Sequence, residues 1–395
     1  MTNWEELKWR GLVKDVSNEK EIEKLINGKG VTFYWGTDPT ADSLHIGHYS
    51  SLVTAKRLMK MGHNPILLCG GATGRIGDPR PTAEREIMSI EKLNDYIEGI
   101  RNQIYKIFEG KAKLVNNYDW FKGYEYLDFL RDIGKYINVN YMLDKDIIRR
   151  RLDTGITYAE FSYMLIQGYD FLNMYDKMNC VLQVEGSDQW GNITTGIDLI
   201  RKIKGKEAYG FTMPLILDAS GNKFGKSEGN AIWLDKEKTS PYQIYQYLIN
   251  SSDSKVEEYL KVFTFLTREE IEDIMAKHNE MPEKRLAQKT LAYEFIKDLH
   301  GEEEAIKAKE ASEAAFSGGV SDNMPTVIVE GSEKNIIDLL VETGLAPSKS
   351  EARRLTEQGA VKVNQEKVED VNLMVQINDT ILSKGKKTII KVCNK

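Results

Sequence analysis

Two histidines that lie three residues apart are the first candidates for chemistry in this sequence. His45 and His48 belong to the segment PTADSLHIGH, residues 39–48, and are two of the five histidines in the chain. One helical turn places both imidazoles on the same side, and a strand–helix junction offers backbone N–H groups and a helix dipole that favour phosphate. Gly47 lets a flat ring approach the backbone. The pattern predicts imidazoles that donate hydrogen bonds to developing negative charge, although a loop with two surface histidines would look similar.

Two lysines with the same spacing form a second candidate group. Lys223 and Lys226 occur in KFGKS, residues 223–227, inside a loop rich in Gly, Asn and Ser. Two ammonium groups around Gly225 suit a mobile clamp on a polyphosphate. Taken alone, this segment fits a basic surface turn, which is the commoner case. Together with the histidine segment far upstream, it indicates phosphate chemistry.

The elements that must position these groups alternate between strand and helix. Residues 31–36, VTFYWG, read as a strand, residues 48–62 show helical spacing up to Gly62, and residues 65–69 read as a second strand. A strand, a helix and a strand in this order predict a βαβ unit and a parallel sheet. Further strands are expected at residues 180–186 and 211–217. The histidines then fall at the first strand–helix junction, and the lysines follow the last strand.

The two chemical segments together resemble the signature of class I aminoacyl-tRNA synthetases, HIGH followed about 175 residues later by a KMSKS-like loop. The likeness extends to YWGTDPTADSLHIGH, to Gly-Asp-Pro at 77–79, to YAEFSYMLIQGYDF at 158–171 and to GSDQWGN at 186–192. This fuller set, which covers essentially the whole chain, is similar to the bacterial tyrosyl-tRNA synthetases. The resemblance implies a ligase that activates L-tyrosine with ATP to tyrosyl-adenylate and pyrophosphate, then transfers tyrosine to the 3′ end of tRNA-Tyr.

The resemblance also implies a pocket for the amino acid. Tyrosine needs an apolar slot with a polar end, where its phenol can donate to Asp170 and accept from Tyr34. Tyr163, Gln167 and Asp170 are spaced four and three apart, so one helix face presents all three. A core helix with buried tyrosines is the alternative. The residues assigned to tyrosine, its ammonium group included, are Tyr34, Asp78, Tyr163, Gln167, Asp170 and, as a weaker candidate, Gln183.

A nucleotide site is implied by the same likeness. Asp188 is suited to a ribose hydroxyl, Gln189 to the neighbourhood of the reacting carboxylate, and Gly186 to close backbone approach, although a plain strand-end turn would explain Ser187 and Asn192. The expected catalytic residues are His45, His48, Lys223 and Lys226. The residues assigned to ATP are Asp38, Thr40, His45, Gly47, His48, Gly186, Asp188, Gln189, Lys223 and Lys226. Magnesium is expected to arrive with ATP, without a dedicated protein metal site.

Two positions depart from the family pattern. Trp35 stands where the family often has a smaller residue, commonly cysteine, that contacts ribose, and an indole cannot copy a thiol hydrogen bond. Glu185 stands where a second glycine often precedes GSDQW. Its carboxylate would lie either against the phosphate or on the other face of the strand.

The expected fold class is α/β, with three domains in sequence. The resemblance implies a Rossmann-like parallel-sheet catalytic domain at residues 1–234 and an α-helical tRNA-binding domain at 235–317. Helical patterns begin at Ser240, where a serine N-cap precedes proline, and continue through 282–317. A linker at 318–334 would lead to a small α+β domain at 335–395, which resembles the S4 RNA-binding domain.

The last block is also the one where the charge balance turns basic. From Glu333 to Lys395 there are 11 Lys+Arg against 9 Asp+Glu, whereas the whole chain carries a net charge of −6. A small basic fold suits contact with an RNA backbone, although a solvated charged face would look the same. The tRNA-binding candidates are Lys349, Arg353, Arg354, Lys384, Lys386 and Lys387.

Composition limits the other function classes. The 395 residues are 41% hydrophobic and 29% charged, without an apolar run of membrane-spanning length or a secretory signal. Three cysteines, none in a C-x-x-C pair, argue against a disulfide scaffold or zinc site and favour a reducing cytoplasm. The aromatic segment 117–140 is expected to form a homodimer surface, as in the family.

Two other functions remain open at this stage. One is the related tryptophanyl-tRNA synthetase, against which Tyr34 and Asp170 argue because an indole has only one hydrogen-bond donor. The other is a catalytically inactive, synthetase-derived RNA-binding protein, against which the intact histidine and lysine segments argue.

Overall fold

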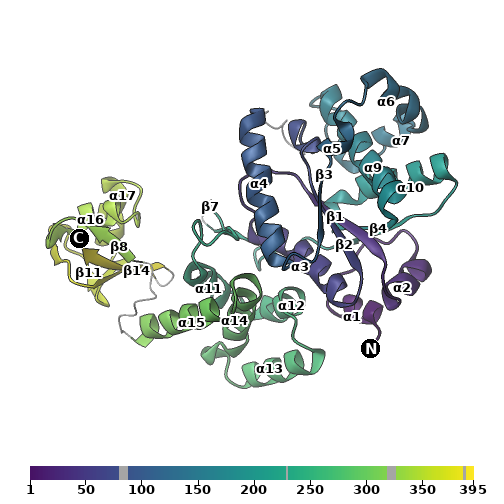
Figure 1. The fold of residues 1–395 in the computed structure, drawn as a ribbon. Helices are drawn as coiled ribbons and strands as arrows, with labels where there is room; N and C mark the ends of the chain where they lie inside the picture. The colour runs from purple at the N-terminus through teal and green to yellow at the C-terminus, as the bar shows by residue number, and fades with distance from the viewer. Residues whose placement is uncertain (80–87, 228–229, 318–325, 386–387) are drawn as a thin grey trace. The chain divides into compact units, whose positions relative to one another are not determined.

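The computed structural model describes residues 1–79, 88–227, 230–317, 326–385 and 388–395 (Figure 1). The chain divides into two compact units. The first unit comprises Met1–Asp235 together with Lys261–Phe263, and the second comprises Lys236–Leu260 and Thr264–Lys395.

The first unit is built on a five-stranded sheet in the order β3-β2-β1-β4-β5, in which all neighbouring strands run parallel. The strands are β1 (Thr32–Thr37), β2 (Asn64–Cys69), β3 (Lys113–Asn116), β4 (Cys180–Gly186) and β5 (Tyr209–Met213). The strand order reverses at β1, which lies between β2 and β4. In parallel sheets, ligands bind beyond the carboxyl ends of the strands at this kind of reversal. The functional site is therefore expected beyond β1 and β4.

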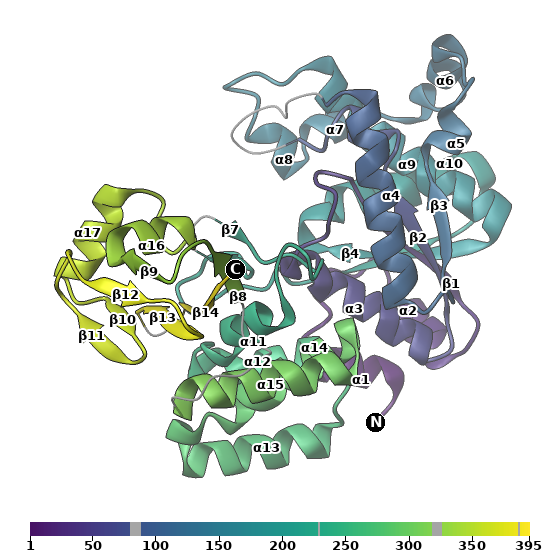
Figure 2. The same cartoon turned by 60° about the vertical axis from the view of Figure 1, so that its left-hand side comes forward.

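Helices cover both faces of this sheet, and so consecutive residues of β1 are buried: Phe33, Tyr34 and Trp35 are each at most 1% exposed. Figures 1 and 2 show α9 and α10 lying side by side. The helices are α1 (Asn3–Trp9), α2 (Glu19–Asn27), α3 (Ile46–Lys60), η1 (Thr73–Arg75), α4 (Ile90–Ile107), α5 (Tyr118–Phe121), α6 (Tyr126–Asp132), η2 (Gly134–Tyr136), α7 (Val139–Leu143), α8 (Asp146–Arg149), α9 (Tyr158–Met178), η3 (Ser187–Gln189) and α10 (Trp190–Lys204). A short hairpin, β6 (Lys226–Ser227) and β7 (Asn230–Ala231), follows.

The structure confirms the α/β fold class and most of the predicted elements of this unit. The strands predicted at 31–36, 65–69 and 180–186 are β1, β2 and β4, and the predicted helix is α3. The strand predicted at 211–217 is too long, because β5 ends at Met213. Pro214 follows directly, and proline has no N–H group to donate to a sheet ladder.

The second unit begins with helices, as predicted. Ser240 caps α11, with Pro241 at the first helical position. The helix expected to run through 282–317 is broken at Arg285 and Gly301, which have φ angles of +53° and +92°. A left-handed residue cannot continue an α-helix. The helices are α11 (Pro241–Ile249), α12 (Asp253–Phe263), α13 (Arg268–Glu280), η4 (Pro282–Lys284), α14 (Leu286–His300) and α15 (Glu302–Ser317).

The end of the chain forms a sheet in the order β11-β10-β13-β14-β8 and a separate β12–β9 pair. Strands β8 and β9 lie inside the expected linker 318–334 or at its edge, so the folded C-terminal part begins before residue 335. Its elements are β8 (Thr326–Val329), β9 (Glu333–Asn335), α16 (Ile336–Glu342), α17 (Lys349–Glu357), β10 (Val361–Val363), β11 (Glu366–Val368), β12 (Met374–Gln376), β13 (Thr380–Lys384) and β14 (Thr388–Asn394). Among the described residues, no helix combines the length and the hydropathy that a membrane crossing requires.

Candidate active site

The carboxyl end of β1 leads into Asp38, whose carboxylate is held from two other elements. Its Oδ1 accepts a 2.6 Å hydrogen bond from the Thr73 hydroxyl after β2, and its Oδ2 accepts a 2.9 Å bond from the Tyr163 hydroxyl of α9. Gly70 makes room for this arrangement, since a Cβ there would stand 2.1 Å from Asp38 Oδ1. Both oxygens of Asp38 are thus engaged, and the side chain fixes the loop on which Thr40 lies exposed.

The two histidines lie where helix α3 begins. The N–H of Gly47 donates to His45 Nδ1 at 3.1 Å, and the N–H of His45 donates to His48 Nδ1 at 3.3 Å. The rings stack with centroids 3.8 Å apart. Because both Nδ1 atoms accept, the proton of each neutral imidazole lies on Nε2. This tautomer makes each ring a donor through Nε2, which is the property expected of them.

The KFGKS segment packs directly on the first turn of α3, which carries the two histidines. Gly225 has a φ of +92°, and a Cβ there would stand 2.1 Å from Ile46 Cγ2, so only glycine fits. The N–H of Ile46 donates to the Ile232 carbonyl at 2.8 Å, which joins the residues after the lysine loop to the start of α3. The structure therefore brings the two chemical segments together across about 175 residues. Lys223 is exposed, and the side chain of Lys226 lies outside the described part.

Asp170, on α9, is the most deeply buried carboxylate assigned to the substrate, at 1% exposure. Its Oδ1 accepts from Trp120 Nε1 at 2.8 Å and its Oδ2 from Asn117 Nδ2 at 3.0 Å. Asn117 cannot turn over, because its Oδ1 accepts the Ala72 N–H at 2.6 Å. Burial raises the pKa of Asp170 to about 8, even though the two donors act in the opposite direction.

Two further buried side chains have polar atoms without partners. Tyr34 and Gln183 are 1% and 0% exposed and lie opposite each other in the β1–β4 ladder. Neither the Tyr34 hydroxyl nor the two amide atoms of Gln183 makes a hydrogen bond within the described part of the chain. Burial raises the pKa of Tyr34 well above its ordinary value, with the Glu185 and Asp170 carboxylates adding to the effect and the neighbouring Gln183 side chain acting in the opposite direction. The ring of Tyr34 packs edge-on against Phe171, the residue after Asp170, with centroids 5.3 Å apart.

A second polar network joins the residues assigned to the ammonium group. Gln189 Nε2 donates to Asp78 Oδ2 at 3.0 Å. Asn192 Nδ2 donates to Gln189 Oε1 at 2.9 Å and to Gln167 Oε1 at 2.8 Å. The structure thus connects Asp78, Gln189 and Gln167 through Asn192, a residue that a plain strand-end turn would have explained. Tyr163, the remaining ammonium candidate, belongs to the Asp38 network instead.

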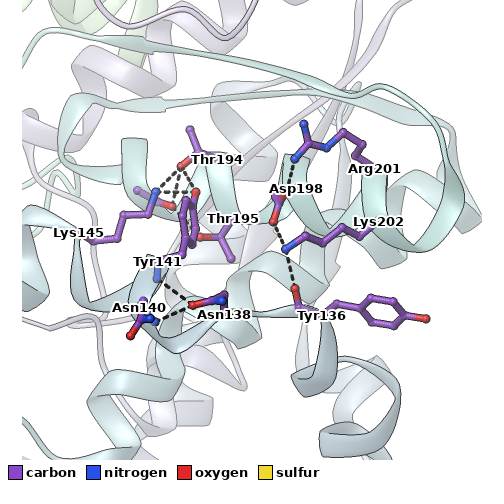
Figure 3. A network of polar contacts seen from close by, with 11 residues as sticks. Tyr136, Asn138, Asn140, Tyr141, Lys145, Thr194, Thr195, Asp198, Arg201 and Lys202 are labelled. Atoms are coloured by element: carbon purple, nitrogen blue, oxygen red, sulfur yellow. Dashed lines mark hydrogen bonds and ion pairs between the residues drawn. The ribbon is translucent and has the colours of Figure 1, made fainter.

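The start of α10, which carries Asn192, is fastened by a lysine (Figure 3). Lys145 Nζ donates to the Tyr141 hydroxyl at 2.6 Å and to the Thr194 hydroxyl at 2.9 Å. Lys202, further along α10, donates to the Tyr136 carbonyl at 2.8 Å. These bonds tie the helix to the segment before α9 and so fix the direction in which Asn192 points.

The remaining nucleotide candidates lie where β4 ends. Gly186 precedes η3, and a Cβ on it would stand 2.7 Å from Asp188 Oδ1. Asp188 is exposed, so its carboxylate is accessible to a ribose hydroxyl. Their contacts with ATP remain predictions.

The two departures from the family pattern have structural roles. The buried indole of Trp35 donates through Nε1 to the Ser51 hydroxyl of α3 at 3.0 Å, on the sheet face opposite to Tyr34. Glu185 is 5% exposed, and its Oε1 accepts the N–H of Gly36 at 2.6 Å. The backbone ladder between β1 and β4 has ended at Tyr34, so this side chain continues it. Burial raises the pKa of Glu185 well above its ordinary value.

Three residues that sequence reasoning missed hold the site together: Thr73, Asn117 and Trp120. Asn117 also donates to the Thr73 hydroxyl at 3.1 Å, which links Asp170 to Asp38 through two intermediate side chains. The one available signal was the position of Asn117 directly after β3, since polar residues at the carboxyl ends of parallel strands often face the ligand.

The cationic candidates of the C-terminal part are partly neutralised. Lys349 pairs with Asp338 at 2.7 Å and Arg354 with Glu351 at 2.6 Å. Arg353 is exposed and Lys384 half-buried, while Lys386 and Lys387 lie outside the described residues. In the same described ranges, no three His, Cys, Asp or Glu side chains gather as metal ligands.

Comparison with known proteins agrees with this geometry. Residues 27–317 match the family described as tRNA synthetases class I (W and Y), and residues 316–393 match a tyrosine–tRNA ligase SYY-like C-terminal domain. The tyrosine–tRNA ligase of Geobacillus stearothermophilus is 46% identical over 97% of both chains. A truncated mitochondrial tyrosyl-tRNA synthetase from Aspergillus nidulans is 33% identical, with a TM-score of 0.71 over 80% of this chain and 94% of that one.

A tryptophanyl-tRNA synthetase from Encephalitozoon cuniculi shares the fold alone, at 15% identity and a TM-score of 0.57 over 77% of this chain and 87% of that one. The family match covers the sheet and helical regions, and the tyrosine relative extends over nearly the full chain. This chain therefore belongs to the class I tRNA synthetases of the tryptophan and tyrosine group, and within that group to the tyrosine–tRNA ligases.

Proposed function

We propose that this chain performs the tyrosine–tRNA ligase reaction with the residues gathered beyond the carboxyl ends of β1, β2 and β4. The observation that carries this assignment is the buried polar end of the pocket. The Tyr34 hydroxyl and the Gln183 amide have no partners in the described part of the chain, beside a carboxylate held by Asn117 and Trp120. Buried polar groups are nearly always satisfied, so these atoms point to a ligand that supplies the missing bonds. A phenol both donates and accepts, as this set requires.

The chemistry then needs no enzyme nucleophile. An oxygen of the tyrosine carboxylate bonds to the α-phosphorus of ATP, and the bond from that phosphorus to pyrophosphate breaks. The residues contribute position and charge stabilisation: His45 and His48 donate through Nε2 to developing negative charge, and Lys223 and Lys226 attract the leaving phosphates. In the second step, a ribose hydroxyl at the 3′ end of tRNA-Tyr takes the tyrosyl group, and AMP leaves.

Magnesium fits this site as a companion of ATP. Magnesium prefers oxygen ligands, and the phosphates of ATP supply them. When bound, the ion would neutralise phosphate charge. We assign no protein residue as its ligand.

The partners follow from the same proposal. Residues 335–395, with the strands before them, would bind tRNA-Tyr through exposed cations such as Arg353. The side chains of Tyr126, Leu127 and Tyr158 are each more than half exposed, and Tyr126 and Tyr158 meet at 3.1 Å through their hydroxyls. A contiguous apolar surface of this kind suits a homodimer. Cys69 and Cys180 are buried thiols, which suits a reducing cytoplasm.

The pocket assignment is tested by Tyr34→Phe, with Tyr242→Phe as the matched control. Tyr242 lies in the second unit, and its buried hydroxyl also lacks a partner within the described part. Removing an unsatisfied buried hydroxyl should stabilise either variant without substrate, by about 1–3 kcal/mol. Only Tyr34→Phe should weaken tyrosine binding, measured by fluorescence titration. Unchanged tyrosine affinity in Tyr34→Phe would exclude Tyr34 as a reader of the phenol.

The RNA assignment is tested by removing residues 318–395. The truncated protein should keep tyrosine-dependent exchange of pyrophosphate into ATP, since the pocket lies in the first unit, and should lose most of its charging of tRNA-Tyr. Charging at the full rate by the truncated protein would show that the C-terminal part is dispensable for tRNA.

A further inference from the structure

Three aromatic rings are stacked behind the KFGKS segment. The ring of Phe224 lies 5.1 Å from that of Phe263 at an interplanar angle of 24°, and Phe263 lies 6.4 Å from Tyr49 at 11°. Tyr49 and Phe263 are 0% exposed and Phe224 is 5% exposed. Tyr49 belongs to α3, one residue after His48, whereas Phe263 is the last residue of α12. The stack therefore joins the lysine segment to the histidine helix through a residue from a third part of the chain.

The position of Phe263 is fixed independently of the lysine segment. Arg10 Nη1 donates to the Lys261 carbonyl at 2.8 Å, and Arg57 Nη2 donates to the Val262 carbonyl at 3.2 Å. Both guanidinium groups are 3% exposed, and they meet the carbonyl end of α12, where a helix dipole favours cations. The end of α12 is thus clamped into the first unit, although the helix begins in the second.

The lysine segment makes further contacts next to this ring. The N–H of Phe224 donates to the Ile216 carbonyl at 3.0 Å, and Gly225 closes against Ile46. Lys223, which directly precedes Phe224, is exposed. Because Phe224 and Gly225 stand between the two lysines, holding this ring in place sets the backbone at both lysine positions.

We propose that Phe263 is a positioning residue for adenylate formation, and that it acts through Phe224. Its ring holds Phe224 in the stack, and Phe224 in turn sets the backbone that carries Lys223 and Lys226. The proposal rests on the role given to these lysines under the proposed function. It adds a residue about 40 positions downstream that touches neither substrate.

The test compares Phe263→Leu, Phe224→Leu and the double variant in tyrosine-dependent exchange of pyrophosphate into ATP. Leucine keeps an apolar side chain at each position and removes the ring stacking. Each single variant should lower kcat by roughly 10- to 100-fold, the scale for small misplacements of catalytic groups, while the KM for tyrosine stays within about twofold. The double variant should be no slower than the slower single variant, because both changes break the same contact.

Phe211→Leu is the matched control. Phe211 is 0% exposed in β5 and packs edge-on against Trp4 at 5.6 Å, so the same substitution removes a buried ring from another aromatic pair of the first unit. The kcat of Phe211→Leu should equal that of the wild type, even if its midpoint of unfolding in urea is lowered as much as the midpoint of Phe263→Leu. A kcat loss shared by the control would mean that stability, not loop position, sets the rate.

Other results would also overturn the proposal. These are an unchanged kcat in Phe263→Leu, losses that multiply in the double variant, or an equal rise in the KM for tyrosine. If Phe263→Leu does not fold, Phe224→Leu probes the same contact from the less buried side, and an unchanged kcat there would refute it. Failure of the proposed function is distinguishable, because the wild-type chain would then show no tyrosine-dependent exchange at all.

Discussion

Asp170→Ala is the substitution that most sharply separates a substrate-reading carboxylate from a structural one. Asp170 accepts from Trp120 Nε1 and Asn117 Nδ2, and it lies beside Phe171, which packs on Tyr34. If the phenol of tyrosine donates to this carboxylate, alanine removes the acceptor. Phenylalanine has no hydroxyl and makes no such bond, so the substitution should leave its kcat/KM nearly unchanged.

The size of the effect follows from these contacts. Above pH 8 Asp170 is ionised, and a hydrogen bond to a charged group contributes about 1.5–3 kcal/mol. The preference for tyrosine over phenylalanine in kcat/KM should therefore fall roughly 10- to 150-fold. The folded state loses two bonds to Asp170 but also loses a carboxylate whose pKa burial raises to about 8. These opposing changes leave the variant folded enough to assay.

The assay is steady-state exchange of pyrophosphate into ATP with each amino acid. The ratio of the two kcat/KM values does not depend on the fraction of active protein. Asp176→Ala is the control, since this carboxylate lies on the same helix, is half exposed, and pairs with Lys204 at 2.7 Å. Its ratio should match that of the wild type. An unchanged ratio in a folded Asp170→Ala variant would refute the assignment of Asp170 to the phenol.

Three further predictions follow from burial and from the lysine segment. Because the pKa of Asp170 is raised to about 8, the folded state keeps a proton that the unfolded chain loses near pH 4, and the stability from this proton is lost as pH rises through about 8. From about pH 5 to about pH 8, the free energy of unfolding of Asp170→Asn, measured with urea, should rise relative to that of the wild type by up to about 1.4 kcal/mol per pH unit. A difference that does not change with pH would contradict this. Glu160→Gln should lower the free energy of unfolding by about 3–5 kcal/mol. The reason is that Arg151, which bonds to both carboxylate oxygens of Glu160 at 3.0 Å, would be left as a buried charge. A loss below about 1 kcal/mol would contradict this. Lys226→Ala should slow adenylate formation about 10²- to 10³-fold in single-turnover assays with tyrosine affinity unchanged, whereas equal losses in both would remove it from the phosphate site.

Short-range spacing made much of the site predictable from sequence. His45 and His48, or Tyr163, Gln167 and Asp170, share a helix face whenever the helix forms, so their grouping needed no knowledge of the fold. Lys223 was tied to the histidines only by its resemblance to a family, because their contact spans most of the first unit.

The holding contacts were not predictable in this way. Asp170 depends on Asn117 and Trp120, about 50 residues earlier, and these bonds form only when folding brings the segment after β3 to α9. From sequence, the Glu185 carboxylate could lie against the phosphate or on the other face of the strand. The structure shows a third arrangement, in which it accepts the N–H of Gly36 and continues the strand ladder. The end of β5 at Met213 had one local signal, because the following Pro214 has no N–H group to donate to a ladder.

The most direct measurement of the central claim is amino-acid-dependent exchange of pyrophosphate into ATP by the full chain, followed by charging of tRNA-Tyr. With ATP and magnesium present, tyrosine should support rapid exchange and charging, whereas tryptophan and phenylalanine should support almost none at the same concentration. Exchange driven by tryptophan instead of tyrosine, or no exchange with any of the three, would contradict the assignment of the pocket and of its catalytic residues.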